Sequence, residues 1–141
     1  MVPRQLLTLL ALCACISMAD AAPSNNRSGN TDRPQAPEVV QKAITVEVLT
    51  PDGAWEVKID EVRHVNSELW VFATVARPDD AIGAMMVSAA MDRVDGRFPD
   101  LPVKTFVVGK TWTWANKEPV QWVSKNEALT MRRRGQRVWR R

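Results

Sequence analysis

Short alternating segments separated by turn residues constrain the fold of this chain more than any other feature of its sequence. In segments 44–49 and 55–60 every second residue is apolar, which is typical of a β-strand with one face toward a core. The sequence Pro-Asp-Gly at 51–53 lies between them and favours a tight turn, because proline fixes φ and glycine tolerates positive φ. The pattern predicts a β-hairpin of these two strands, with Val62 and Val65 extending the second strand across a bulge.

The middle of the chain contains three further strand candidates. Residues 66–68 are a turn signal, and the nearly continuous apolar run at 69–76 predicts a strand buried on both faces. Residues 84–94 fit a helix or a strand: their alanines and methionines favour the helix, whereas Gly83 and the surrounding strands favour the strand. We predict a strand there, and another at 103–108 after a loop.

A second hairpin is predicted nearer the C-terminus. Segments 110–114 and 120–123 flank the five residues 115–119, whose composition suits a loop. Pairing across this loop places four large apolar side chains on one side of the hairpin, where they form a cross-strand cluster. They are Trp112, Trp114, Val120 and Trp122.

The last segments predict a helix and an edge strand. Ser-Lys-Asn-Glu at 124–127 matches a capping box, so a short helix should run to about Arg134, with Gly135 as its terminator. Val138 and Trp139 add a final edge strand. Many short strands, with turns about every 8 to 12 residues, predict a mainly β fold: a small antiparallel β-sandwich or partly open barrel with one short C-terminal helix.

The N-terminus has the three parts of an export signal. Arg4 supplies a positive charge, residues 6–16 form an apolar run of 11 residues, and Ala-Asp-Ala at 19–21 supplies small residues for cleavage. In a helix this run covers about 16 Å, about half of a hydrocarbon core, so we predict a signal peptide at 1–21 and no transmembrane segment in the mature chain. The mature protein is expected outside the cytoplasm, in the periplasm or secreted.

Both cysteines, Cys13 and Cys15, lie inside this signal. Cleavage after residue 21 leaves a chain without disulfides, so apolar burial must stabilise the core. In the alternative, Leu-Cys-Ala-Cys at 12–15 acts as a bacterial lipobox, and a lipidated Cys15 anchors the same domain to a membrane face. Residues 22–38 are polar and lack an apolar period, which predicts a disordered linker before a single domain at 39–141.

The composition argues against an enzyme. His64 is the only histidine, and the mature chain has no cysteine, so a catalytic triad or a zinc site lacks its residues. Asp60 and Glu61 are adjacent in a strand and should point to opposite faces. Asp79 and Asp80 lack the pattern of a calcium-binding loop. We therefore predict a non-enzymatic protein without a cofactor or a metal.

Two predicted loops, at 77–83 and 115–119, are candidate binding sites together with the neighbouring tryptophans. Exposed indoles can clamp a peptide, and rigid β-domains of this size often display loops to a protein partner, such as an exported enzyme that they inhibit. In the alternative, the tryptophan face packs against the second sheet. The candidate partner-binding residues are Trp112, Trp114, Asp79, Asp80, Asn116 and Lys117.

Positive charge is concentrated at the C-terminal end. Residues 22–131 contain 12 Lys and Arg against 15 Asp and Glu, whereas residues 132–141 contain six arginines and no acid. This cluster predicts binding to an anionic surface of lipid or polysaccharide, and export disfavours nucleic acid as the partner. In the alternative, these arginines only suit a helix end and a solvated chain terminus. The candidate anion-binding residues are Arg132, Arg133, Arg134, Arg137, Arg140 and Arg141.

Overall fold

The computed structural model describes residues 36–141, which form seven strands and one short helix. The predicted signal peptide, Cys15 and most of the predicted linker lie outside the described residues. Within residues 36–141 no helix is long and apolar enough to cross a bilayer. The elements in chain order are β1 (Val39–Thr50), β2 (Glu56–Val65), β3 (Glu68–Ala76), β4 (Ser88–Pro99), β5 (Val103–Val108), β6 (Val120–Trp122), α1 (Lys125–Met131) and β7 (Gln136–Arg140).

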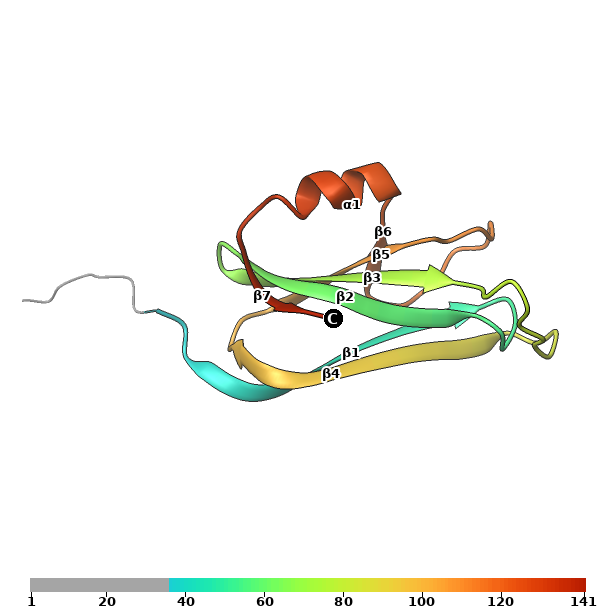
Figure 1. Ribbon diagram of the computed structural model, residues 1–141, viewed down its shortest axis with the longest axis horizontal. Helices are drawn as coiled ribbons and strands as arrows, with labels where there is room; N and C mark the ends of the chain where they lie inside the picture. Colours follow the sequence, from blue (N-terminus) through green and yellow to red (C-terminus); the bar gives the residue numbers. More distant parts are fainter. Residues whose placement is uncertain (1–35) are drawn as a thin grey trace, which may run out of the picture. The chain divides into compact units, whose positions relative to one another are not determined.

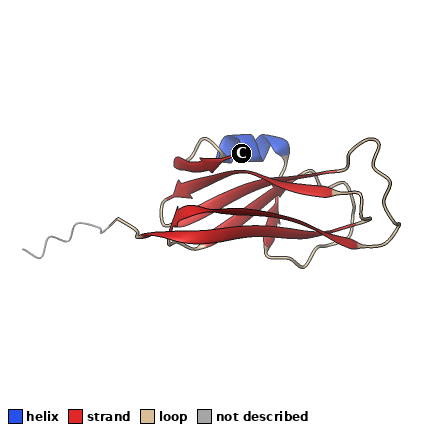
Figure 2. Cartoon of the chain, turned by 60° about the horizontal axis from the view of Figure 1, so that its bottom comes forward, coloured by secondary structure: helices blue, strands red, loops and turns tan. Residues whose placement is uncertain are grey.

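The strands form two sheets that pack face to face, and α1 lies on the far side of the larger sheet (Figures 1 and 2). The smaller sheet is the pair β1-β4, and the larger one has the order β6-β5-β3-β2-β7. The larger sheet is mixed, because β5 runs parallel to both β3 and β6. The mainly β prediction is confirmed, and of the two predicted arrangements it is the sandwich that forms, since the sheets do not close into a barrel.

The first predicted hairpin is wrong. β1 pairs along its whole length with β4, whereas β2 pairs with β3 and β7. Residues 51–55 do turn the chain, but they carry it from one sheet to the other. This crossing stacks the inward side chains of β1 and β2 in one core, as with Val48 and Ile59, which are both fully buried. The same alternation therefore serves two sheets packed face to face.

Two apolar clusters hold the three layers together. Leu69, Val71 and Phe98 are among the buried residues between the sheets. On the other side of the larger sheet, Phe72 packs with Phe106 and with Ala128 of α1, and the two phenylalanine rings stack 5.4 Å apart. β3 contributes side chains to both clusters, which confirms the prediction of a strand buried on both faces.

The ambiguous segment and the second predicted hairpin have different outcomes. Residues 88–94 belong to β4, as the strand prediction requires, whereas residues 84–87 lie in the preceding loop.

The prediction of a second hairpin is wrong: residues 109–119 form a loop, and β6 pairs in parallel with β5. Residues 110–114 are not a strand, so β6 has no antiparallel partner across the loop. Cross-strand pairing therefore cannot build the tryptophan cluster.

The C-terminal elements follow the prediction except for the length of the helix. The Ser124 hydroxyl accepts the Glu127 N–H at 3.2 Å, and the Glu127 carboxylate accepts the Ser124 N–H at 2.7 Å, which confirms the capping box. The helix ends at Met131 rather than near Arg134, because the Arg133 and Arg134 amides bond to carbonyls three residues back and tighten the chain into a turn. Gly135, at φ 62°, then leads into β7, the predicted edge strand.

Candidate binding sites

Three loops lie together at one end of the sandwich: residues 51–55, 77–87 and 109–119, which we call the loop end (Figure 1). The first two are in close contact. Arg77 Nε lies 3.3 Å from Asp52 Oδ2, and the Gly53 N–H donates to the Ala84 carbonyl at 3.4 Å. A Cβ atom on Gly83 would lie 2.5 Å from the Ala54 nitrogen. The loop at 77–87 is therefore seated on a turn that is itself fixed to both sheets.

The loop at 109–119 is held by Trp112. This ring contacts three other indoles, those of Trp55, Trp114 and Trp122, at centroid distances of 5.2, 5.5 and 5.6 Å. Its Nε1–H donates to Asn116 Oδ1 at 2.8 Å, and the Asn116 amide donates to the Leu49 carbonyl at 2.9 Å. Three of the four predicted members, Trp112, Trp114 and Trp122, thus come together, but they do so through a loop rather than across a hairpin, and Trp55 joins them. Trp112 and Asn116 support the loop, and Trp114 lies on its outside.

Glu118 fixes the same loop to the end of β1 by accepting the Leu49 N–H. Burial by itself would raise the pKa of this carboxyl, but the hydrogen bonds from the Leu49 N–H and the Asn116 amide outweigh burial. Its pKa therefore lies below the ordinary value of 4.5. The ionised form of Glu118 is the one that stabilises the loop.

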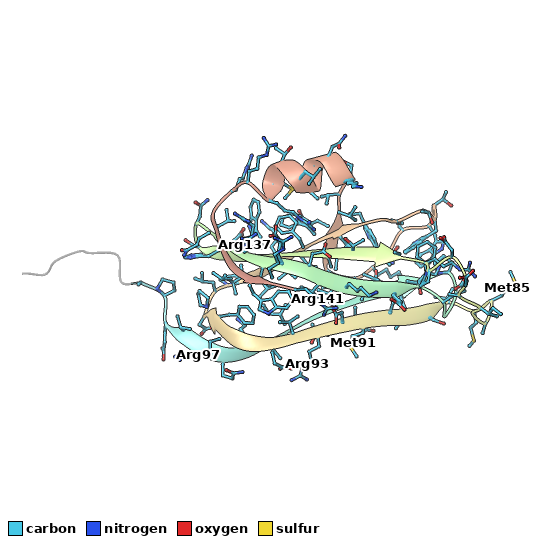
Figure 3. All side chains as sticks on the ribbon, viewed as in Figure 1. Met85, Met91, Arg93, Arg97, Arg137 and Arg141 are labelled. Atoms are coloured by element: carbon cyan, nitrogen blue, oxygen red, sulfur yellow. The ribbon has the colours of Figure 1, made fainter. Side chains whose placement is uncertain are left out.

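Four consecutive or nearly consecutive apolar side chains stand out in solvent on the loop at 77–87, and we call them the apolar tip. Ile82 and Met85 are each 99% exposed, Met86 is 66% exposed and Val87 is 58% exposed. Figure 3 shows Met85 at the far end of the molecule, pointing away from it. Asp79 and Asp80 on the same loop, and Lys117 on the loop at 109–119, are also exposed.

Sequence reasoning missed the apolar tip because it assigned residues 84–87 to a regular element. A signal was present: Pro78 and Gly83 bracket the start of an apolar run that has no alternation of its own. Trp114 on the loop at 109–119 is 36% exposed, and Leu49, near the end of β1, is 39% exposed. Several large apolar side chains exposed at one end of a domain are typical of an interaction site.

A second candidate site is a groove of about 670 Å³ on the helix side of the larger sheet, which we call the arginine groove. Cross-strand neighbours share a face, so β2, β3 and β7 form its floor, and the C-terminal end of α1 supplies Arg132 beside it. The lining residues are Asp60, Glu61, Arg63, Thr74, Arg132, Arg137, Arg140 and Arg141.

The prediction that Asp60 and Glu61 point to opposite faces is wrong. A β-bulge lies between Ile59 and Glu61, and the extra residue brings both carboxylates to the helix side of the sheet. They meet at Arg132: its Nη2 lies 2.6 Å from Asp60 Oδ2, and its Nε lies 3.6 Å from Glu61 Oε1. The guanidinium carbon also lies 5.2 Å from the centre of the Phe72 ring.

The six predicted anion-binding arginines divide into three kinds. Arg132 and Arg141 form ion pairs, the second with Asp92 at 2.7 Å. Arg133 and Arg134 are exposed and do not line the groove. Arg137 and Arg140 do line it, and among residues 36–141 their side chains make no hydrogen bond or ion pair.

Arg63 is the groove arginine that sequence reasoning missed, because it stands alone in the middle of a strand. Its Nε and Nη2 donate to the main-chain carbonyls of Arg134 and Gly135 at 2.8 and 3.0 Å. Its Nη1 lies 3.6 Å from Glu61. Arg63 therefore fixes the turn before β7 and adds positive charge to the groove.

The single histidine and the acidic residues form no metal-binding cluster in the part of the chain that the structure describes. His64 is half-buried on β2, and no group of three or more His, Cys, Asp or Glu is close enough to hold a metal within residues 36–141. Comparison with models of protein families, with curated proteins and with solved structures found no match to this chain. The loop end and the arginine groove are therefore the two surfaces that indicate a function.

Asp92 makes the stability of the domain dependent on pH. Burial by itself raises the pKa of this carboxyl, but hydrogen bonds from the Ile59 N–H and the Arg141 guanidinium, each at 2.7 Å, outweigh burial and hold the pKa below 3.8. A carboxyl with a lowered folded-state pKa stabilises the protein fully above its unfolded pKa, and the stabilisation is lost as the pH falls through the folded value.

We therefore expect the free energy of unfolding in urea to fall more steeply from about pH 5 to about pH 2 for the wild type than for Asp92→Asn. The variant should already be less stable at neutral pH, because an amide interacts more weakly with Arg141 than a carboxylate does. If the free energy of unfolding falls by the same amount for both proteins over this pH range, Asp92 does not link β4 to β2 through its charge.

Proposed function

We propose that this protein is a non-enzymatic binding protein that works outside the cytoplasm and docks a protein partner, such as an exported enzyme that it inhibits, with its loop end. One observation carries the proposal: Ile82 and Met85 are almost completely exposed on a loop that is otherwise firmly seated. Fully burying side chains of this size contributes about 1.5–3 kcal/mol each. An interface that covers the tip gains this energy.

The chemistry of the loop end suits a protein surface. Methionine and aromatic residues are enriched in the cores of protein interfaces, and the unbranched methionine side chain adapts to an uneven surface. The seating of the loop on residues 51–55 and the anchoring of 109–119 by Trp112 limit the entropy lost on binding. Trp114, Lys117 and the acidic pair at 79–80 add exposed aromatic and charged side chains on the loops of the same end.

Insertion of the tip into a membrane is less consistent with the charges. Asp79 and Asp80 precede the apolar residues, and the basic residue of the loop, Arg77, is paired with Asp52. Segments that bind anionic membranes instead carry unpaired basic residues beside their apolar ones. The groups around the tip therefore favour a protein partner.

The test compares the wild type with the double variant Ile82→Ser/Met85→Ser, each expressed as the full chain and purified as the host processes it. Met91→Ser is the matched control, because Met91 is 64% exposed on the outer face of β4 and lies outside the loop end. Cell-envelope extract is passed over each protein, a captured protein is identified and purified, and its affinity is titrated. We expect the tip variant to bind at least about thirtyfold more weakly and the control to bind like the wild type.

Two outcomes would contradict the proposal. In one, the captured protein binds the tip variant as tightly as the wild type. In the other, the wild type captures no protein but binds lipid vesicles through the same two side chains, which would make the tip a membrane anchor. Melting temperatures of all three proteins should agree, since the substituted side chains are exposed.

A further inference from the structure

The arginine groove is separate from the loop end and uses different elements. Its floor is the helix-side face of β2, β3 and β7, and α1 leaves this part of the sheet open because it packs over Phe72 and Phe106. A volume of about 670 Å³ is within the range of small-ligand sites. Figure 3 labels Arg137 on β7 and Arg141, which directly follows the end of this strand.

Charge is unbalanced in the groove. Five arginines and two carboxylates line it. Arg132 is shared by Asp60 and Glu61, and Arg141 is paired with Asp92 beside the groove. Arg137 and Arg140 remain without an anionic partner among residues 36–141, and each guanidinium offers five N–H donors.

A β-bulge places these two arginines on the same side. In a regular strand, residues three apart point to opposite faces. The pairing of β7 with β2 shifts between Val62 and Arg63, so that Val138 is an extra residue and Arg137 and Arg140 lie opposite Arg63 and Glu61. Bulges that re-aim side chains are over-represented beside functional sites. The convergence of the arginines is thus built into the backbone.

The groove is also preorganised. Hydrogen bonds to main-chain carbonyls fix Arg63, and the ion pairs with the carboxylates fix Arg132. A ligand that binds Arg137 and Arg140 therefore enters a positive groove whose other charged side chains are already oriented. Planar guanidinium groups suit oxyanions with two acceptor oxygens, such as phosphate and sulfate.

We infer that the arginine groove is a second binding site, for a sugar that carries sulfate or phosphate esters, with Arg137 and Arg140 as the direct contacts. A sugar chain can enter a groove of this volume, whereas a flat bilayer surface would touch only the rim of the groove. Arg133 and Arg134 are not part of the site, and Arg132 and Arg141 act mainly in structural ion pairs.

The test is a calorimetric titration of the protein with a sulfated hexasaccharide at about 50 and about 200 mM salt. The groove variant is Arg137→Gln/Arg140→Gln. The control is Arg133→Gln/Arg134→Gln, which removes the same charge from the same end of the chain but outside the groove. We expect the groove variant to bind at least about thirtyfold more weakly and the control to change affinity less than about threefold. The tip variant should bind like the wild type, which separates this inference from the proposed function.

Three outcomes would overturn the inference. In the first, both variants weaken binding equally, which is the effect of net charge alone. In the second, the wild type does not bind the hexasaccharide at millimolar concentration, and in the third it binds phosphatidylglycerol vesicles but not the hexasaccharide. Circular dichroism of the variants checks that the fold is kept. Because both substituted pairs are exposed, the melting temperatures should agree with that of the wild type.

Discussion

Replacing Gly109 by alanine should lower the free energy of unfolding by at least about 3 kcal/mol and the melting temperature by about 12 °C or more. Gly109 directly follows β5 and has φ 105°, a conformation that residues with a Cβ atom rarely adopt. A Cβ atom there would lie 2.1 Å from the Val75 carbonyl oxygen. The chain after β5 would have to move away from β3, in the centre of the larger sheet. Thermal and urea unfolding followed by circular dichroism measure the effect.

Gly53→Ala is the matched control, since its Cβ atom would meet only the Ser88 hydroxyl, at an ordinary contact distance of 3.5 Å. Its φ is not positive, and the loss of chain entropy in the unfolded state should leave stability within about 1 kcal/mol of the wild type. A Gly109→Ala protein that melts within a few degrees of the wild type would mean that the chain does not approach β3 this closely.

The second large effect is expected for Arg132→Met, at about 3 kcal/mol. The substitution keeps much of the apolar stem of the side chain but removes the group that faces Asp60 and Glu61. Glu61 is buried, so its carboxylate would keep only the ion pair with Arg63 at 3.6 Å. A buried charge that loses a partner destabilises the fold more than the pair stabilised it. Urea unfolding at neutral pH measures the loss.

Two further variants separate this effect from a general loss of positive charge. Arg133→Met removes an exposed arginine next to Arg132 and should change stability by less than about 0.5 kcal/mol. Adding Glu61→Gln to Arg132→Met should restore at least about 1 kcal/mol, since the unpaired charge is removed. If the double variant is no more stable than Arg132→Met alone, the ion pair does not couple the C-terminal end of α1 to β2.

The sequence predicts most of the strands of this domain but not which strands pair. Alternation in 44–49 and 55–60 reports that one face of each segment is buried, and it is the same for a hairpin and for two stacked sheets. Which of the two arrangements forms depends on the pairing of β1 with β4. The alternation of β4 places Ala90, Val94 and Phe98 in the core. Local signals that need no distant partner, such as the capping box, were predicted correctly.

The candidate sites were predicted in part, because side-chain direction depends on backbone irregularities that residue types do not report. The bulges in β2 and β7 reverse the expected direction of Asp60 relative to Glu61, and of Arg137 relative to Arg140. The end of the helix at Met131 decides which arginines lie beside the groove. A cluster of arginines in the sequence thus becomes a pair of groove residues, two structural residues and two solvated ones.

The chain passes from the smaller sheet to the larger one directly after β1, and this affects the order of folding. β2 and β3 are joined by two residues, with Asn66 at φ 55°, and their pairing closes a short loop. The nearest paired residues of β1 and β4, Thr50 and Ser88, are 38 positions apart. Non-local pairing must recover its loop-closure entropy before it is stable, so β2–β3 is the natural nucleus. We expect the smaller sheet to close late, and its two long strands to stay open to other pairing partners until it does.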